Sequence, residues 1–78
     1  MQCFFVQIKT KLGKAYQVAD ELAQREVASE VYSTSGEYDL LAKFYVEDEE
    51  DIGHFVNANL HDIPGVERTF TTLTFKAF

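Results

Sequence analysis

Apolar and polar positions follow two different periods along this chain, and the changes of period divide it into six segments. Residues 2–9 carry apolar side chains on both alternating sets, which is typical of a strand that is covered on both faces. The next segment repeats its apolar residues at helical spacing and predicts an amphipathic helix. The apolar positions of this helix are Leu12, Ala15, Tyr16, Ala19, Leu22 and Ala23.

Two further strands and a turn follow this helix. The residues of Glu26–Ser33 and Asp39–Val46 favour strands, and Ser35-Gly36 between them allows a positive φ without steric cost. The sequence therefore predicts a hairpin centred on Gly36.

The acidic run Glu47–Asp51 predicts the start of a second helix, because carboxylates are favourable at the positive end of a helix dipole. We expect this helix to end near Asp62, since Ile63-Pro64-Gly65 is a strong break. Residues Val66–Phe78 are rich in Thr and Phe and predict a long final strand. The inward positions of the second helix are Ile52, Phe55, Val56 and Leu60.

The order strand, helix, strand, strand, helix, strand predicts an α+β fold of the ferredoxin-like βαββαβ type. Its four-stranded antiparallel sheet would carry both helices on one face. The strands nevertheless hold apolar residues on both alternations, for example Leu41, Tyr45 and Phe70 opposite the core set. An open apolar sheet face indicates an interface, so we expect a homodimer formed through this face.

Size and composition favour the same interpretation. With 78 residues the chain is expected to form one domain, 1–78, and a domain of this size buries only about 60% of its unfolded surface. Yet it is 46% hydrophobic, with 7 Phe and 4 Tyr, and a partner subunit is the simplest cover for this surface. The single Cys3 offers no disulfide, and no His/Cys cluster suggests a structural metal, so no cofactor is expected.

The charge balance narrows the range of partners. The net charge is −6, with 13 acidic against 7 basic residues, which argues against direct contact with nucleic acid. Neither a signal segment nor an apolar run of membrane-spanning length is present. We therefore expect a cytoplasmic protein with no nucleic-acid or membrane partner.

The predicted hairpin turn concentrates chemistry that a plain turn does not need. An amino acid carries an ammonium group next to a carboxylate. The ammonium group binds carboxylates of the protein, and the ligand carboxylate binds N–H groups or hydroxyls. Simpler roles remain open: a turn glycine for Gly36, interface packing for Tyr38 and a turn-stabilising acceptor for Asp39. The candidate ligand-binding residues of the turn are Thr34, Ser35, Gly36, Glu37, Tyr38 and Asp39.

The sequence gives little support for a metal site or for a catalytic site. His54 and His61 are seven residues apart, whereas a metal pair on adjacent helical turns needs a spacing of three or four. The acidic run 47–51 lacks the alternating ligands and central Gly of a calcium loop. No Ser-His-Asp or Cys-His set can be assembled, so catalytic residues are not expected.

Three stretches together resemble the ligand-binding domain of the Lrp/AsnC transcriptional regulators, also called the regulation-of-amino-acid-metabolism domain. They are Thr34-Ser35-Gly36-Glu37-Tyr38-Asp39, Ile63-Pro64-Gly65-Val66 and Arg68-Thr69-Phe70-Thr71. The resemblance implies a βαββαβ dimer that assembles further, to an octameric or decameric ring of dimers. It also implies an amino-acid effector in the cleft between dimers, where Thr69 and Thr71 of another subunit complete the site.

Family regulators also carry a helix-turn-helix domain, whereas here Met1 leads directly into the first strand. We therefore expect a stand-alone, non-enzymatic sensor without a DNA-binding domain, which could act by co-assembly with a full-length relative. Two alternatives stay open. One is a small cofactor-free oxygenase or isomerase of the dimeric ferredoxin-like type, and the other is a structural assembly module with an empty cleft.

Overall fold

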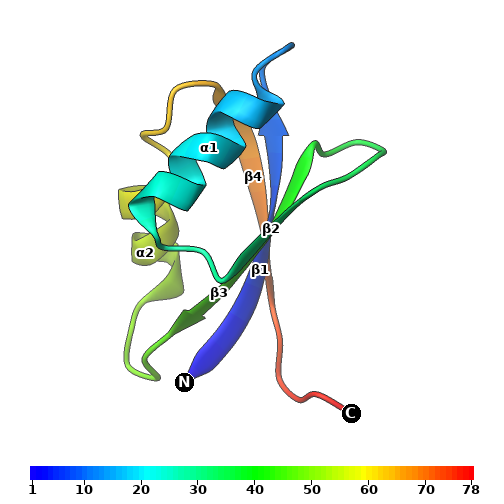
Figure 1. The fold of residues 1–78 in the computed structure, drawn as a ribbon. Coiled ribbons are helices and arrows are strands. Elements are labelled where there is room, and N and C mark those ends of the chain that lie inside the picture. Colours follow the sequence, from blue (N-terminus) through cyan, green and yellow to red (C-terminus); the bar gives the residue numbers. More distant parts are fainter.

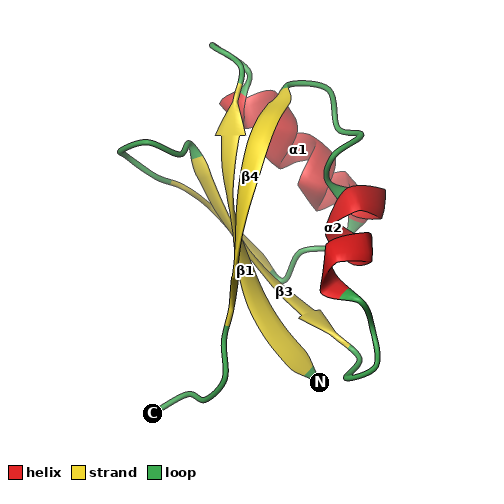
Figure 2. Ribbon diagram, turned by 180° about the vertical axis from the view of Figure 1, so that it is seen from behind, coloured by secondary structure: helices red, strands yellow, loops and turns green.

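The computed structural model describes residues 1–78 and has the predicted order of elements. The two helices form one layer and the sheet forms the other, with both termini at the same end of the sheet (Figures 1 and 2). The elements are β1 (Gln2–Thr10), α1 (Ala15–Arg25), β2 (Glu30–Ser33), β3 (Leu40–Val46), α2 (Ile52–Asn59) and β4 (Val66–Leu73).

The strands pair antiparallel in the order β2-β3-β1-β4, which confirms the ferredoxin-like α+β prediction. In β1, Phe4, Val6 and Ile8 are completely buried under the helices. Their partners on β3 are Phe44, Ala42 and Leu40, which are equally buried. The period of two in the sequence therefore sets which sheet face the helices cover.

An aromatic cluster joins the sheet to α2. The rings of Phe4 and Phe44 stack with centroids 5.1 Å apart, and Phe55 of α2 meets both edge-on at 5.8 and 5.7 Å. Val56 and Leu60 are buried beside it, as the helical spacing predicts. Asp51 caps this helix through its Oδ1, which accepts a hydrogen bond from the His54 N–H at 3.0 Å.

The predicted inward face of α1 is partly wrong. Leu12 and Tyr16 are exposed, whereas Val18, which the spacing did not select, is buried with Leu22. The helix begins only at Ala15, after a turn at Gly13 with φ of +77°, so Leu12 lies outside it. Val18 and Leu22 have the i, i+4 spacing of one helical face, and Ala19 packs beside them as predicted.

Two strand boundaries also differ from the prediction. The first hairpin strand begins at Glu30 rather than Glu26, because α1 continues to Arg25 and Glu26 ends it with a left-handed φ of 56°. The final strand ends at Leu73 rather than Phe78. Leu73 pairs with Phe4, close to where β1 begins, so little strand remains for later residues to pair with.

The sheet face away from the helices is open and carries apolar side chains among polar ones such as Gln7, Lys43 and Thr72. Cys3 and Phe5 of β1 lie on it, with Leu41 and Tyr45 of β3 and Phe70 of β4. Tyr45 and Phe70 keep about half of their surface exposed, at 47% and 55%. Neither helix is long and apolar enough to cross a membrane.

Candidate functional site

The loop between β2 and β3 holds the predicted turn at the end of the sheet where β1 stops. The Thr34 N–H donates to the Asp39 carbonyl at 2.9 Å, and the Thr34 hydroxyl donates to the Tyr38 carbonyl at 3.1 Å. Gly36 has a φ of +99° and open space around it, which agrees with its prediction as a turn glycine. The loop thus has a defined shape while its tip stays exposed.

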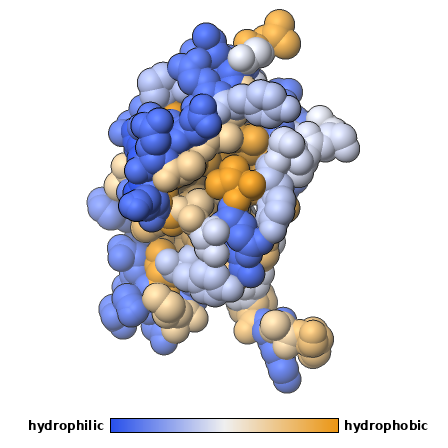
Figure 3. All heavy atoms as spheres, viewed as in Figure 1, coloured by the Kyte–Doolittle hydropathy of each residue, from blue (hydrophilic) through white to orange (hydrophobic).

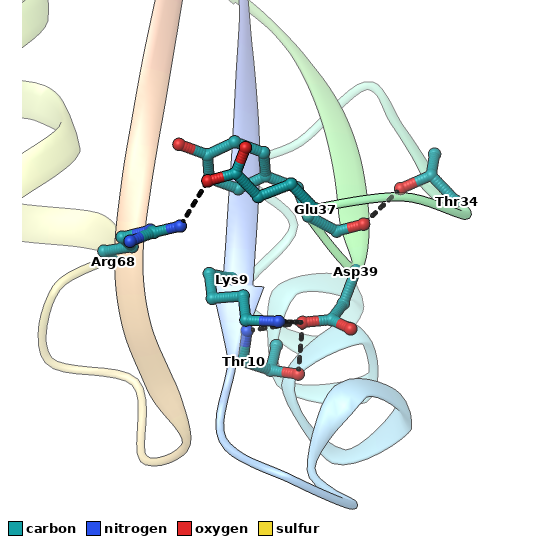
Figure 4. A network of polar contacts seen from close by, with 7 residues as sticks. Lys9, Thr10, Thr34, Glu37, Asp39 and Arg68 are labelled. Carbon is teal, nitrogen blue, oxygen red and sulfur yellow. Dashed lines mark hydrogen bonds and ion pairs between the residues drawn. The ribbon is translucent and has the colours of Figure 1, made fainter.

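Asp39 connects this loop to the end of β1 (Figure 4). Its Oδ2 accepts hydrogen bonds from the Thr10 N–H at 2.8 Å and from the Thr10 hydroxyl at 3.1 Å. Lys9 Nζ lies 4.0 Å from the same oxygen. The Thr10 N–H, aided by the hydroxyl and by Lys9, lowers the pKa of Asp39 below its usual value.

Glu37 and Tyr38 both contact Arg68 of β4. Glu37 Oε2 lies 2.6 Å from Arg68 Nη2, in an ion pair that stays largely exposed (Figure 4). The Arg68 guanidinium lies 5.5 Å from the centre of the Tyr38 ring, which also packs 6.3 Å from the Phe70 ring. The loop is therefore held against the open face of the sheet by an ion pair and by aromatic packing.

Four charged residues consequently gather at one end of the sheet, and we call Lys9, Glu37, Asp39 and Arg68 the charge cluster. Lys9 and Arg68 are paired neighbours on β1 and β4, and each cation faces one carboxylate of the loop. A cluster with both signs of charge can offer partners to both ends of a zwitterion. A hollow of about 250 Å³ adjoins it, lined by Lys9, Thr10, Lys11, Leu12, Gly13, Ala15, Asp39 and Glu67.

Thr69 and Thr71 do not join the turn residues within one chain. They pair with Ile8 and Val6, so they face the helix side of β4, whereas Arg68 and Phe70 face the open side. The Thr69 hydroxyl lies 3.0 Å from His61 Nε2, across a separate hollow. Their meeting with a second subunit's loop stays a prediction, as does ligand contact by Ser35, which is exposed at the loop tip.

Sequence reasoning missed Lys9, Thr10 and Arg68 as parts of this end of the sheet. A signal for Arg68 was available, since it alternates with Thr69 and so must face the opposite side of the strand. The role of Thr10 had no such signal, because it depends on which residues the antiparallel register of β1 and β3 places side by side.

Comparison with known proteins identifies the class. The model of the Lrp/AsnC ligand binding domain family matches residues 3–78, so this chain belongs to that family. An HTH-type transcriptional regulator of Pyrococcus abyssi, FL11, is 39% identical over 72 residues, covering 92% of this chain and 47% of the regulator. The FL11 of Pyrococcus horikoshii is 38% identical over the same length. The chain spans about half the length of these curated relatives.

Solved structures share the fold. TTHA0845 of Thermus thermophilus superimposes with a TM-score of 0.88 at 33% identity, covering 100% of this chain and 98% of that one. The regulator NMB0573 of Neisseria meningitidis, solved as a complex with L-Met, has a TM-score of 0.82 at 19% identity. That match covers 96% of this chain and 50% of the regulator. The sequence-based recognition of the family is confirmed, and the relatives are named as transcriptional regulators rather than enzymes.

Proposed function

We propose that this domain is a non-enzymatic sensor that binds an amino acid or a closely related metabolite at the charge cluster. The observation that carries the proposal is the pairing of two loop carboxylates with two strand cations at an exposed end of the sheet. Exposed ion pairs contribute little to stability, so a zwitterion can replace the Glu37–Arg68 contact at small cost. The carboxylate of the ligand would then pair with Arg68, and its ammonium group with the carboxylate that Glu37 releases.

The predicted assembly fits this role. In the proposal two copies pair through their open sheet faces, and dimers join further so that Thr69 and Thr71 of a second subunit complete the cleft. The exposed apolar residues of the open face, such as Tyr45 and Phe70, support the dimer. Family membership and a relative solved with L-Met support the class of ligand. Regulation of transcription would follow from co-assembly with a full-length relative.

The site is tested by calorimetric titration with the twenty common amino acids, first in pools and then singly. We expect binding of one or a few of them to the wild-type domain. The Asp39→Ala variant should stay folded and lose this binding, because its loop loses both the carboxylate and its anchor on Thr10. The matched control is Asp20→Ala, which removes an exposed carboxylate of α1 that makes no contact with the cluster.

Other outcomes distinguish the remaining functions. Binding that survives Asp39→Ala and Arg68→Ala would place the ligand elsewhere and contradict the proposed site. Absence of binding to any amino acid would favour a structural module or another metabolite.

A further inference from the structure

The chain after β4 forms a short tail, residues 74–78, that leaves the sheet. Its first residue is anchored, since the Thr74 hydroxyl donates to the Cys3 carbonyl at 2.7 Å. Beyond it the tail stands away from the body of the molecule (Figures 1 and 3). The side chains of Phe75 and Phe78 are fully exposed to solvent. Two aromatic rings in water represent apolar surface that this fold leaves uncovered.

A hollow of about 620 Å³ lies beside the root of this tail on the open sheet face. Cys3, Phe5 and Tyr45 of the open sheet face line it, and residues 74–77 of the same chain's tail line it as well. Lys43 Nζ lies 5.9 Å from the centre of the Phe5 ring and 5.2 Å from that of the Tyr45 ring. Aromatic surface with a cation beside it suits a further aromatic ring. The hollow lies beside the start of β1, at Gln2 and Cys3, whereas the charge cluster lies at the end of this strand, at Lys9.

The charge of the tail is opposite to that of an acidic segment close to the hollow, although Lys43 in the hollow itself is a cation. Lys76 is the only charged residue after Arg68. The exposed acidic run Glu47–Asp51 lies against the N-terminus that helps to line the hollow, because the Gln2 side-chain amide donates to the carbonyls of Glu47, Asp48 and Glu50. A tail laid into a neighbouring molecule's hollow would thus bring Lys76 to the end of the sheet where this acidic run lies.

We propose that the tail of one copy fills this hollow in a second copy, so that the two copies of the dimer exchange their tails. Phe75 and Phe78 supply the rings, and the hollow at Phe5 and Tyr45 of the other copy receives them. In a two-fold dimer the exchange is reciprocal, since each copy presents both the tail and the hollow. This inference rests on the proposed dimer through the open sheet face, with which the hollow is continuous.

Disulfide trapping tests the exchange, because Cys3 is the single cysteine and lines the hollow. In Phe78→Cys, mild oxidation should link the introduced thiol to Cys3 of the other copy and give a covalent dimer under non-reducing conditions. Peptide mass spectrometry identifies the linked pair, and adding Cys3→Ser should remove this link. Leu12→Cys is the matched control, since Leu12 is equally exposed but lies beside the charge cluster. A Cys3 link formed within one chain, or no Cys3 link, would overturn the exchange.

Dimer dissociation gives a second, independent readout. We expect the double variant Phe75→Ser with Phe78→Ser to raise the dimer dissociation constant about tenfold or more, while Leu12→Ser leaves it unchanged. An unchanged constant in the double variant would contradict the tail exchange and leave the sheet-face dimer intact. A wild-type monomer at micromolar concentration, by light scattering, would instead contradict the dimer itself and the exchange with it. Leu41→Glu, on the open face outside the hollow, tests the dimer alone.

Discussion

The carboxylate of Asp39 accepts two hydrogen bonds from one residue, Thr10, through its backbone N–H at 2.8 Å and its hydroxyl at 3.1 Å. Thr10 is the one polar residue in the buried set, with 5% of its surface exposed. A buried N–H needs a partner, and Asp39, the residue just before the neighbouring strand β3, supplies it. The relationship therefore fixes both the end of β1 and the base of the loop that carries the charge cluster.

This contact predicts a pH dependence of stability. The pKa of Asp39 is lowered in the folded protein, so its stabilising effect is complete above the unfolded pKa of about 3.9. It is lost as the pH falls through the lower folded pKa. We expect Asp39→Asn to lower the melting temperature by several degrees at pH 7, and the difference from wild type to shrink below pH 3. Thermal unfolding by circular dichroism measures it, and Asp20→Asn should show no such pH-dependent difference.

Gly36 and Gly65 have the same backbone angle, so substitutions at them distinguish the cost of backbone strain from the cost of overpacking. Gly36 and Gly65 both have φ of +99°, but a Cβ on Gly36 meets open space. On Gly65 it would lie 3.1 Å from Lys14 Cβ and from Val18 Cγ2. We expect Gly36→Ala to cost about 1–2 kcal/mol of unfolding free energy and Gly65→Ala about 2–4 kcal/mol, since overpacking adds to strain. Equal losses of unfolding free energy for the two variants, measured in urea, would show that the side chains around Gly65 move aside without cost.

The aromatic cluster predicts how strongly α2 is held. Phe55 contacts Phe4 and Phe44, and its removal leaves a cavity between α2 and the sheet. Phe55→Ala should cost about 3 kcal/mol, a large share of the roughly 5–15 kcal/mol available to a small domain. His54→Ala on the exposed side of the same helix should cost far less. A similar urea midpoint for both variants would mean that α2 is not anchored through Phe55.

A substitution of Arg68 is expected to affect ligand binding much more than the stability of the fold. Its ion pair with Glu37 is exposed on both sides, so Arg68→Ala should leave the melting temperature of the free domain within a few degrees of wild type. In the proposed site the same change removes the partner of the effector carboxylate, and we expect the affinity to fall at least tenfold. Lys14→Ala is the control, and calorimetry measures both. A loss of affinity that merely follows a loss of fold would argue against a direct role.

The sequence predicted the fold well because the evidence for it is local. The alternation of Phe4, Val6 and Ile8 and the spacing of Val56 and Leu60 each report burial without knowledge of the rest of the chain. Gly36 and the break at Ile63-Pro64-Gly65 likewise placed the turns. The helical face of α1 was harder to predict, because small and aromatic residues such as Tyr16 fit the periodicity yet remain exposed.

The site was predicted only in part. The turn Thr34–Asp39 could be found because its residues are consecutive. The contacts of Asp39 with Thr10 and of Glu37 with Arg68 join residues 29 and 31 positions apart, and they depend on the order and register of three strands. Thr69 entered the candidate set through a family resemblance, which does not say which face of a strand a side chain occupies within one chain.

Thermal unfolding of the purified domain with each common amino acid at millimolar concentration tests the central claim most directly. A ligand at a hundredfold excess over its dissociation constant stabilises by about 2.7 kcal/mol, and each kcal/mol raises the melting temperature of a domain this size by about 4–8 °C. We predict a clear rise with one or a few amino acids, which Asp39→Ala abolishes and Asp20→Ala retains. An unchanged melting temperature with every amino acid would contradict the assignment of this domain as an amino-acid sensor.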